Sequence, residues 1–217
     1  MSAEAPVVPL SQLLAINPAT PTNSLGSGDL VSFIPMVDVT ESGEWIGKLV
    51  KRLRDVRSGF TAFRNDDILF AKITPCMENG KGAHVTGLQN GIGFGSTEFH
   101  VLRAIPGVYS RYVYHWLQSS RLRQKAEAIM TGSAGQQRVP AEFFSRFSVP
   151  LFTYDEQHDI ANILDTVDAA IQQTEALIAK LKVMKAGLLH DLLTRGLDGE
   201  GRLRDAGARP GSSRKQR

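Results

Sequence analysis

The sequence has one cysteine, Cys76, among its 217 residues, and it has no long apolar run. A single thiol excludes an intramolecular disulfide framework and fits a reducing cytoplasm. No run is long enough to cross a bilayer, and the N-terminus has no signal pattern, which excludes the membrane-spanning and secreted classes. We therefore expect a cytoplasmic protein with no membrane partner.

The sequence also lacks the motifs that common enzyme classes need. It has no GxxxxGK phosphate-binding loop, and the run from Gly91 to Gly95 (GIGFG) precedes strand-like residues, which indicates a turn. One cysteine and five scattered histidines give no zinc-binding spacing. The run from Asn17 to Thr20 (NPAT) departs from the Asn/Asp-Pro-Pro-aromatic motif of amino methyltransferases. We expect no catalytic residue, no metal site and no cofactor.

Positive charge is present in two segments. The formal net charge is +3, but residues 202–217 carry six basic residues against Asp205, so the rest of the chain is slightly acidic. The glycine and serine content of this end predicts a disordered basic tail over residues 197–217, either solvated or in weak contact with nucleic acid. The segment from Lys48 to Arg57 has five basic residues and one acid, which fits a solvated strand face or a phosphate-contacting face.

Residues 1–152 predict a mixed α/β globular domain. The proline-rich residues 1–28 predict a leader with a short helical turn at 10–14. Short apolar runs separated by glycine, serine or asparagine then predict five strands. These lie at 30–36, 48–54, 67–74, 83–87 and 98–103.

The second half of this domain has helical spacing. Residues 109–130 predict one helix, with Tyr112, Val113, Trp116 and Leu117 on a core-facing side. A polar loop at 131–139, a short helix at 140–147 and a buried-looking segment at 148–152 follow. The fold class we predict is therefore α+β, with one long C-terminal helix after the domain.

The stretch from Thr153 to Thr194 predicts that helix, and we place the helical segment at 153–196. Thr153 and Glu156 have capping-box spacing, and Gly196 is the expected C-terminal stop. At about 1.5 Å per residue the helix is roughly 60 Å long, which exceeds a small domain. Apolar residues at alternating steps of three and four predict a coiled-coil dimerisation seam. The seam residues are Ile160, Leu164, Val167, Ile171, Ile178, Leu181, Leu188 and Leu192. The alternative is a helix that folds back on its own domain.

Polar side chains in three glycine-containing loops are candidates for DNA binding. Gln, Asn and Arg can pair with base edges in the major groove, and Lys can bind guanine acceptors or phosphates. The alternative is loop solvation and ordinary turn chemistry. The candidates are Lys72, Thr74, Asn79, Lys81, Ser96, Thr97, Gln136, Gln137 and Arg138.

Several of these segments together resemble specificity subunits of type I restriction–modification systems. The resemblance covers about residues 29–196, and its strongest part is the approach to the long helix from Val149 to Asp168. The matching runs are DILFAKITPCMENGKGA, GSTEFHVLR, GQQRV, VPLFTYDEQHDIANILDTVDAAI and LKVMKAGLLHDLLT.

The resemblance implies a non-catalytic subunit whose target recognition domain binds double-stranded DNA and reads one half of a split site. It implies that the long helix packs against a counterpart and sets the distance between two such domains. The implied partners are type I methyltransferase (modification) subunits and, where cleavage occurs, a motor-nuclease (restriction) subunit. Family members commonly hold two recognition domains and two helices, whereas this chain has one of each, so we expect a half-length subunit that acts as a homodimer. The rival interpretation is a coiled-coil assembly module that does not bind DNA.

Overall fold

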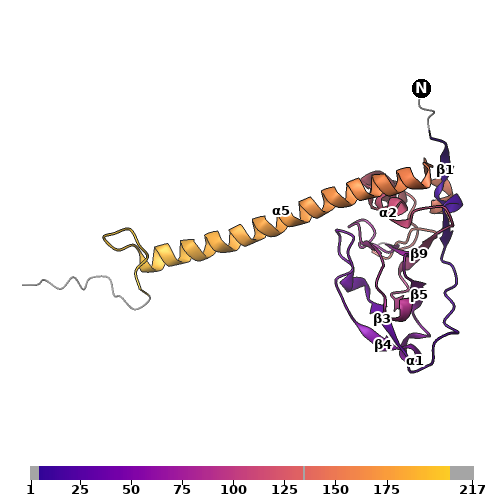
Figure 1. The fold of residues 1–217 in the computed structure, drawn as a ribbon, viewed down its shortest axis with the longest axis horizontal. Helices are drawn as coiled ribbons and strands as arrows, with labels where there is room; N and C mark the ends of the chain where they lie inside the picture. Colours follow the sequence, from indigo (N-terminus) through magenta and orange to yellow (C-terminus); the bar gives the residue numbers. More distant parts are fainter. Residues whose placement is uncertain (1–4, 134, 206–217) are drawn as a thin grey trace, which may run out of the picture. The chain divides into compact units, whose positions relative to one another are not determined.

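The structure, a computed structural model, describes residues 5–133 and 135–205. The chain divides into two units, one ending at Ile163 and the other starting at Leu164. The first unit holds the sheets and short helices, and the second unit consists mainly of the rest of the long helix (Figure 1). This arrangement confirms the predicted fold class, a mixed sheet-and-helix domain followed by one long helix.

Two four-stranded sheets form the first unit. The first is antiparallel, and its strands in spatial order are β2 (Leu14–Ile16), β9 (Phe99–Ala104), β6 (Ile68–Ala71) and β7 (Gly82–His84). The second is mixed, because its β3–β8 pair is parallel; its order is β4 (Val50–Arg52), β3 (Leu30–Ile34), β8 (Ile92–Gly95) and β5 (Thr61–Arg64).

Strand β6 is central to the core because both of its faces are covered. Side chains alternate across a strand. Ile68 and Phe70 therefore enter a cluster with the helices, while Leu69 and Ala71 enter a second cluster with residues such as Phe63 of the other sheet. All four β6 residues are buried, which explains why this strand is a continuous apolar run rather than an alternating one.

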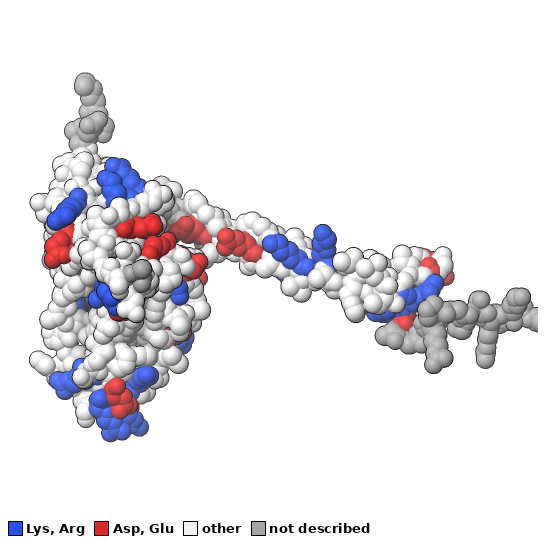
Figure 2. All heavy atoms as spheres, turned by 180° about the vertical axis from the view of Figure 1, so that it is seen from behind, with Lys and Arg blue, Asp and Glu red and all other residues white. Residues whose placement is uncertain are grey.

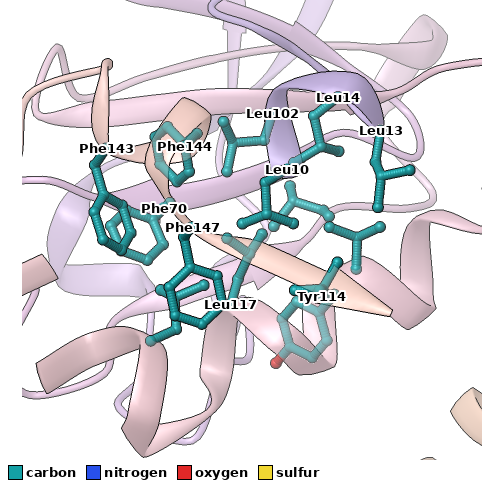
Figure 3. Close-up of a cluster of buried hydrophobic side chains, with 14 of the residues drawn as sticks. Leu10, Leu13, Leu14, Phe70, Leu102, Tyr114, Leu117, Phe143, Phe144 and Phe147 are labelled. Carbon is teal, nitrogen blue, oxygen red and sulfur yellow. The ribbon is translucent and has the colours of Figure 1, made fainter. Parts of the chain in front are cut away.

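The helices cover the outer face of the first sheet. They are α2 (Ser110–Gln118), α3 (Ser120–Glu127) and the single-turn α4 (Phe143–Arg146); α1 (Leu53–Val56) packs on the second sheet. Three short 3-10 turns lie at Leu10–Gln12, Met36–Asp38 and Gln89–Gly91. Figure 3 shows Leu10, Leu13 and Leu14 in one buried cluster with Phe70, Phe143, Phe144 and Phe147.

The predicted leader at residues 1–28 is wrong where two strands form, whereas the short helical turn expected at 10–14 is confirmed as the 3-10 turn at Leu10–Gln12. Strand β1 (Val7–Pro9) pairs with β10 (Ser148–Pro150), and β2 extends the first sheet. Between them Leu10 and Leu13 are buried in the main core. Strands β1 and β2 were not predicted because they have three residues each, which is too short to show the alternation of apolar and polar residues typical of a strand.

Two further segments differ from the sequence prediction. The helix expected at 109–130 is two helices, because Ser119 is extended (ψ 137°) and its hydroxyl accepts from the Leu122 amide as an N-cap. The turn expected at Gly91–Gly95 is present only at Gly91, and residues Ile92–Gly95 form strand β8, paired on both sides. A Cβ at Gly93 would lie 2.1 Å from the Phe63 ring, so glycine is required where the ring crosses the strand. The five predicted strands are confirmed as β3, β4, β6, β7 and β9.

The long helix α5 (Tyr154–Arg195) has 42 residues, as predicted. The capping box is present: the Thr153 amide donates to Glu156 Oε2 at 2.9 Å, and the Glu156 amide donates to Thr153 Oγ1 at 3.4 Å. Its first turns belong to the first unit. Gln157 is buried, donates to the Phe152 carbonyl at 2.8 Å and accepts from the Tyr109 amide at 2.9 Å.

Beyond Ile163 the helix belongs to the second unit. Gly196 follows it with φ +67°, the left-handed conformation expected of a helix stop. Part of the segment assigned to the tail, residues 197–205, forms a turn in which Leu197 bridges Leu203. Residues 206–217 lie outside the described part of the chain. No helix in the described ranges combines the length and the apolar character needed to span a membrane.

Candidate nucleic-acid interface

The three predicted loops meet at one edge of the first sheet. Strands β6 and β9 are antiparallel, so the end of β6 lies beside the start of β9. The Lys72 amide therefore donates to the Glu98 carbonyl at 2.9 Å. The third loop joins them, because the Val139 amide donates to the Lys72 carbonyl at 2.9 Å and the Thr74 amide donates to the Gln137 carbonyl at 3.0 Å. Backbone hydrogen bonds thus hold these loops as one surface.

Arg138 and Glu98 form an ion pair on this surface. Arg138 Nε donates to Glu98 Oε2 at 2.9 Å and Nη2 donates to Oε1 at 2.7 Å, while Nη1 donates to the Gln136 carbonyl at 3.0 Å. The hydrogen bond from Arg138 lowers the pKa of Glu98, and the same bond raises the pKa of Arg138. Three of the five guanidinium N–H groups have acceptors, which leaves two without an acceptor among the described residues.

His100 lies beneath the third loop. Its Nε2 is 2.8 Å from the Val139 carbonyl and its Nδ1 is 3.1 Å from the side-chain nitrogen Nδ2 of Asn17. One neutral tautomer satisfies both contacts, with Nε2–H donating and Nδ1 accepting. Burial lowers the pKa of His100, so the ring is neutral near pH 7. It ties β9 to the loop that carries Arg138.

Arg123 holds the other end of the 72–81 loop. This side chain is buried, and its guanidinium donates to the carbonyls of Met77, Gly80 and Lys81 at 3.1 to 3.4 Å and to Leu117 at 2.9 Å. It also lies 4.2 Å from the Phe70 ring centre. Burial lowers the pKa of Arg123 to about 10, which still leaves it charged near pH 7. A charged group satisfied by carbonyls makes this turn rigid.

Four of the remaining predicted residues have side chains that form hydrogen bonds within the protein. Thr74 donates to Glu78 at 2.7 Å, and Ser96 accepts from the Glu98 amide. Asn79 donates to Glu41 at 2.9 Å, and Lys81 donates to the Met36 carbonyl at 3.3 Å, so both face the 36–41 segment.

The side chains of Thr97, Gln136 and Gln137 make no hydrogen bond to another described residue. Thr97 and Gln136 are exposed, and Gln137 is half-buried. Gln136 and Thr97 are thus the candidates best placed to meet a ligand without breaking an internal contact.

Charge on this surface is nearly balanced. Arg138 is neutralised by Glu98, and Lys72 lies close enough to Glu98 to contribute to its lowered pKa. Such a surface suits directional hydrogen bonding to base edges better than attraction of phosphates. In the described part of the first unit, no three histidine, cysteine or acidic side chains converge closely enough to hold a metal ion.

Two residues that position this surface, His100 and Arg123, are not among those predicted from the sequence. His100 lies in a strand of apolar residues. In the sequence, Arg123 resembles the other basic residues of its helix, which are exposed. A signal for His100 would have been a polar residue inside a buried strand, which needs a partner. No local pattern distinguishes Arg123, because the carbonyls of the 72–81 loop that accept from it are 42 to 46 residues away.

Comparisons with known proteins agree on one family. Residues 17–183 match the family model described as type I restriction modification DNA specificity domain. The chain is 39% identical over 153 residues to the EcoAI type I restriction enzyme specificity subunit of Escherichia coli, covering 70% of this chain and 26% of that protein. It is 33% identical over 191 residues to the EcoEI specificity subunit of the same organism, covering 80% and 32%. The chain thus spans between a quarter and a third of the length of these relatives.

Solved structures show the same fold. A chain from a type I R-M system, solved to describe complex assembly and conformational transition, gives a TM-score of 0.70 at 16% identity, covering 95% of this chain and 53% of that one. The HsdS subunit from Thermoanaerobacter tengcongensis gives a TM-score of 0.65 at 17% identity, covering 93% and 52%. At these identities the likeness concerns the fold alone.

Proposed function

Because the chain belongs to the type I restriction modification DNA specificity family, we propose that it recognises one half of a bipartite DNA site without catalysing any reaction itself. In this proposal the first unit reads bases through the loops at 72–81, 96–98 and 131–139. The base-reading candidates are Lys72, Thr74, Asn79, Lys81, Ser96, Thr97, Gln136, Gln137 and Arg138. The balanced charge and rigid backbone of these loops support this role.

The observation that carries the proposal is the joining of this domain to a helix with an exposed heptad stripe. Seven seam residues are between 39% and 57% exposed: Leu164, Val167, Ile171, Ile178, Leu181, Leu188 and Leu192. Exposed apolar surface of this regularity marks a protein interface. Ile160, the first predicted seam residue, packs instead against the core of the first unit. The exposed stripe therefore begins at Leu164.

We propose that a second copy of the chain covers this stripe. Leu181, Met184, Leu188 and Leu192 line one apolar groove on the helix, which suits the knobs of an identical helix. A two-fold dimer would present two identical recognition units and so require an inverted-repeat site. The complex would direct methyltransferase subunits and, where cleavage occurs, a motor-nuclease subunit to that site.

Mapping methylated bases in the DNA of the native cell, with and without this gene, tests the function. We expect removal of the gene to abolish methylation at one bipartite motif, and the gene carried on a plasmid to restore it. The purified chain alone should transfer no methyl group from S-adenosylmethionine. An unchanged methylation map would favour the rival interpretation, an assembly module that does not bind DNA.

A further inference from the structure

The segment from Lys48 to Arg57 forms a basic surface that the loops do not include. We call its five basic residues the basic edge: Lys48, Lys51, Arg52, Arg54 and Arg57. All five are exposed. They lie on and around β4, the outermost strand of the second sheet, and on the short helix α1. Figure 2 shows lysine and arginine atoms around a small acidic patch at the end of the first unit that carries β4 and α1.

The local fold explains why these side chains point outward. Helix α1 buries Leu53 and Val56 completely, and this three-residue spacing leaves Arg54 and Arg57 on its exposed side. Lys51 lies on the strand with its Nζ 3.7 Å from the Phe33 ring centre, a cation–π contact that orients the ammonium group. The positive charges are therefore carried on and around a strand and a helix of the folded unit.

These charges are largely uncompensated. Arg54 approaches Asp55 at 3.7 Å, while the other four basic residues form no ion pair with a described residue. Charged residues on an outer strand also prevent edge-to-edge pairing of sheets. That explanation covers Lys51 and Arg52 but not Arg57, which lies beyond the strand. The positive charge that this explanation does not cover fits an anionic partner.

The distance between the basic edge and the loops indicates which anion the basic edge would bind. Strand β3 connects the two: Leu30 at its start pairs with Arg52, and the carbonyl of Ile34 at its end accepts from the Ser96 amide at 3.4 Å. Four strand steps separate these ends by about 13 Å. The major groove of DNA is about 12 Å wide, so bases at the loops would bring a backbone near the basic edge.

We propose that the basic edge binds the phosphate backbone of duplex DNA beside the groove that the loops read. This inference rests on the proposed function and deepens it, since it assigns base reading and phosphate binding to different residues. The loops, whose charges are paired, supply specificity. The basic edge supplies the salt-dependent part of the affinity.

Replacing Arg52 and Arg57 by glutamine in the full chain tests this assignment. Arg52 is the N-cap residue of α1 and makes no side-chain cap bond, so the helix should be retained. Binding to a labelled random-sequence duplex is measured by fluorescence anisotropy over a series of KCl concentrations. Each lost phosphate contact should reduce the slope of log K against log salt by about 0.9, so the double variant should lose about two units of slope. Affinity at moderate salt should fall more than about tenfold.

Two matched variants separate phosphate binding from net charge. Arg121→Gln with Arg146→Gln removes the same charge from exposed positions elsewhere in the first unit and should leave the salt slope unchanged. Arg52→Lys with Arg57→Lys keeps the charge and should retain the slope. Circular dichroism confirms that each variant is folded.

The outcomes are distinct. A parental chain that binds no duplex would contradict the proposed function and the inference with it. A parent that binds, beside an Arg52/Arg57 variant with the same affinity and slope, would overturn the inference alone. An equal loss in the Arg121/Arg146 variant would reduce the effect to net charge and also overturn it. Binding of the parent and of the Arg52/Arg57 variant to polyglutamate is measured in the same way. If the variant loses binding to polyglutamate but keeps binding to DNA, the inference is overturned, because the basic edge would then bind an acidic protein.

Discussion

At the scale of single residues, Arg138 and Glu98 form an ion pair at the candidate interface, and we propose that this pair orients Arg138 for reading a base. Glu98 holds the guanidinium in one orientation through two hydrogen bonds. We predict that Arg138→Ala costs about 1–3 kcal/mol on the cognate site and relaxes the choice of base at one position. Glu98→Gln should show part of the same loss, because it removes the carboxylate that orients the Arg138 guanidinium. Affinities on cognate and scrambled duplexes measure both effects, with Arg121→Ala as the control. Unchanged discrimination by the Arg138 variant would remove it from the base-reading set.

Lys72 should behave differently if it only neutralises a phosphate. Lys72→Ala would then weaken binding to cognate and scrambled duplexes alike and reduce the salt slope by about one.

His100 makes the fold sensitive to mild acid. Burial holds its pKa below the ordinary value of 6.5, so the unfolded chain binds the proton first as the pH falls. The stability that the neutral ring contributes is complete above about pH 6.5 and is lost as the pH drops from there toward the folded pKa. The lowered pKa of Glu98 acts only below 4.5 and does not enter this window.

We predict that His100→Gln reduces the difference between urea midpoints measured near pH 7.5 and near pH 5.5. The variant should also be less stable at the higher pH, by about 1 kcal/mol for each hydrogen bond lost. An unchanged pH dependence would assign the acid sensitivity to another group.

At the scale of elements, helix α5 carries the exposed apolar stripe that the proposed dimer would bury. Leu164→Asp with Ile171→Asp places two charges in the proposed seam one heptad apart, and burying them should cost several kcal/mol of dimer stability. Ala169→Asp with Ala176→Asp introduces the same charges with the same spacing on the opposite side of the heptad. Light scattering should report a monomer for the first variant and the parental mass for the second. If both keep the parental mass, the seam is not the interface.

At the scale of the whole molecule, the proposed dimer predicts that helix length sets the site. Duplicating residues Ile171–Leu177 adds one heptad and keeps the apolar register. Seven residues add about 10 Å of helix, which is about three base pairs of DNA. Methylation mapping should then return the same two half-sites with a spacer about three base pairs longer. Replacing this heptad by another with the same apolar positions should leave the spacer unchanged. Altered half-sites would contradict the separation of reading from spacing.

The sequence by itself determined the features that repeat along the chain. The length of α5, its capping box at Thr153 and its heptad stripe were all predictable, because a helix makes its contacts within four residues. The five strands with clear apolar runs were predictable because the apolar run that marks each strand lies within the strand itself. The loops that carry the candidate site were found from their glycines and polar residues.

Only the tertiary structure decided which distant residues meet. The β1–β10 pair brings Val8 to Val149, and no local pattern encodes a pairing across so much of the chain. Strand β8 was not predicted because its glycines show no strand period. Gly93 is a glycine because the Phe63 ring, from another strand, packs against it. The ion pair of Arg138 with Glu98 spans 40 residues, and it orients a guanidinium group whose partner no local pattern reveals. These features depend on packing between segments, which the sequence specifies only through the complete fold.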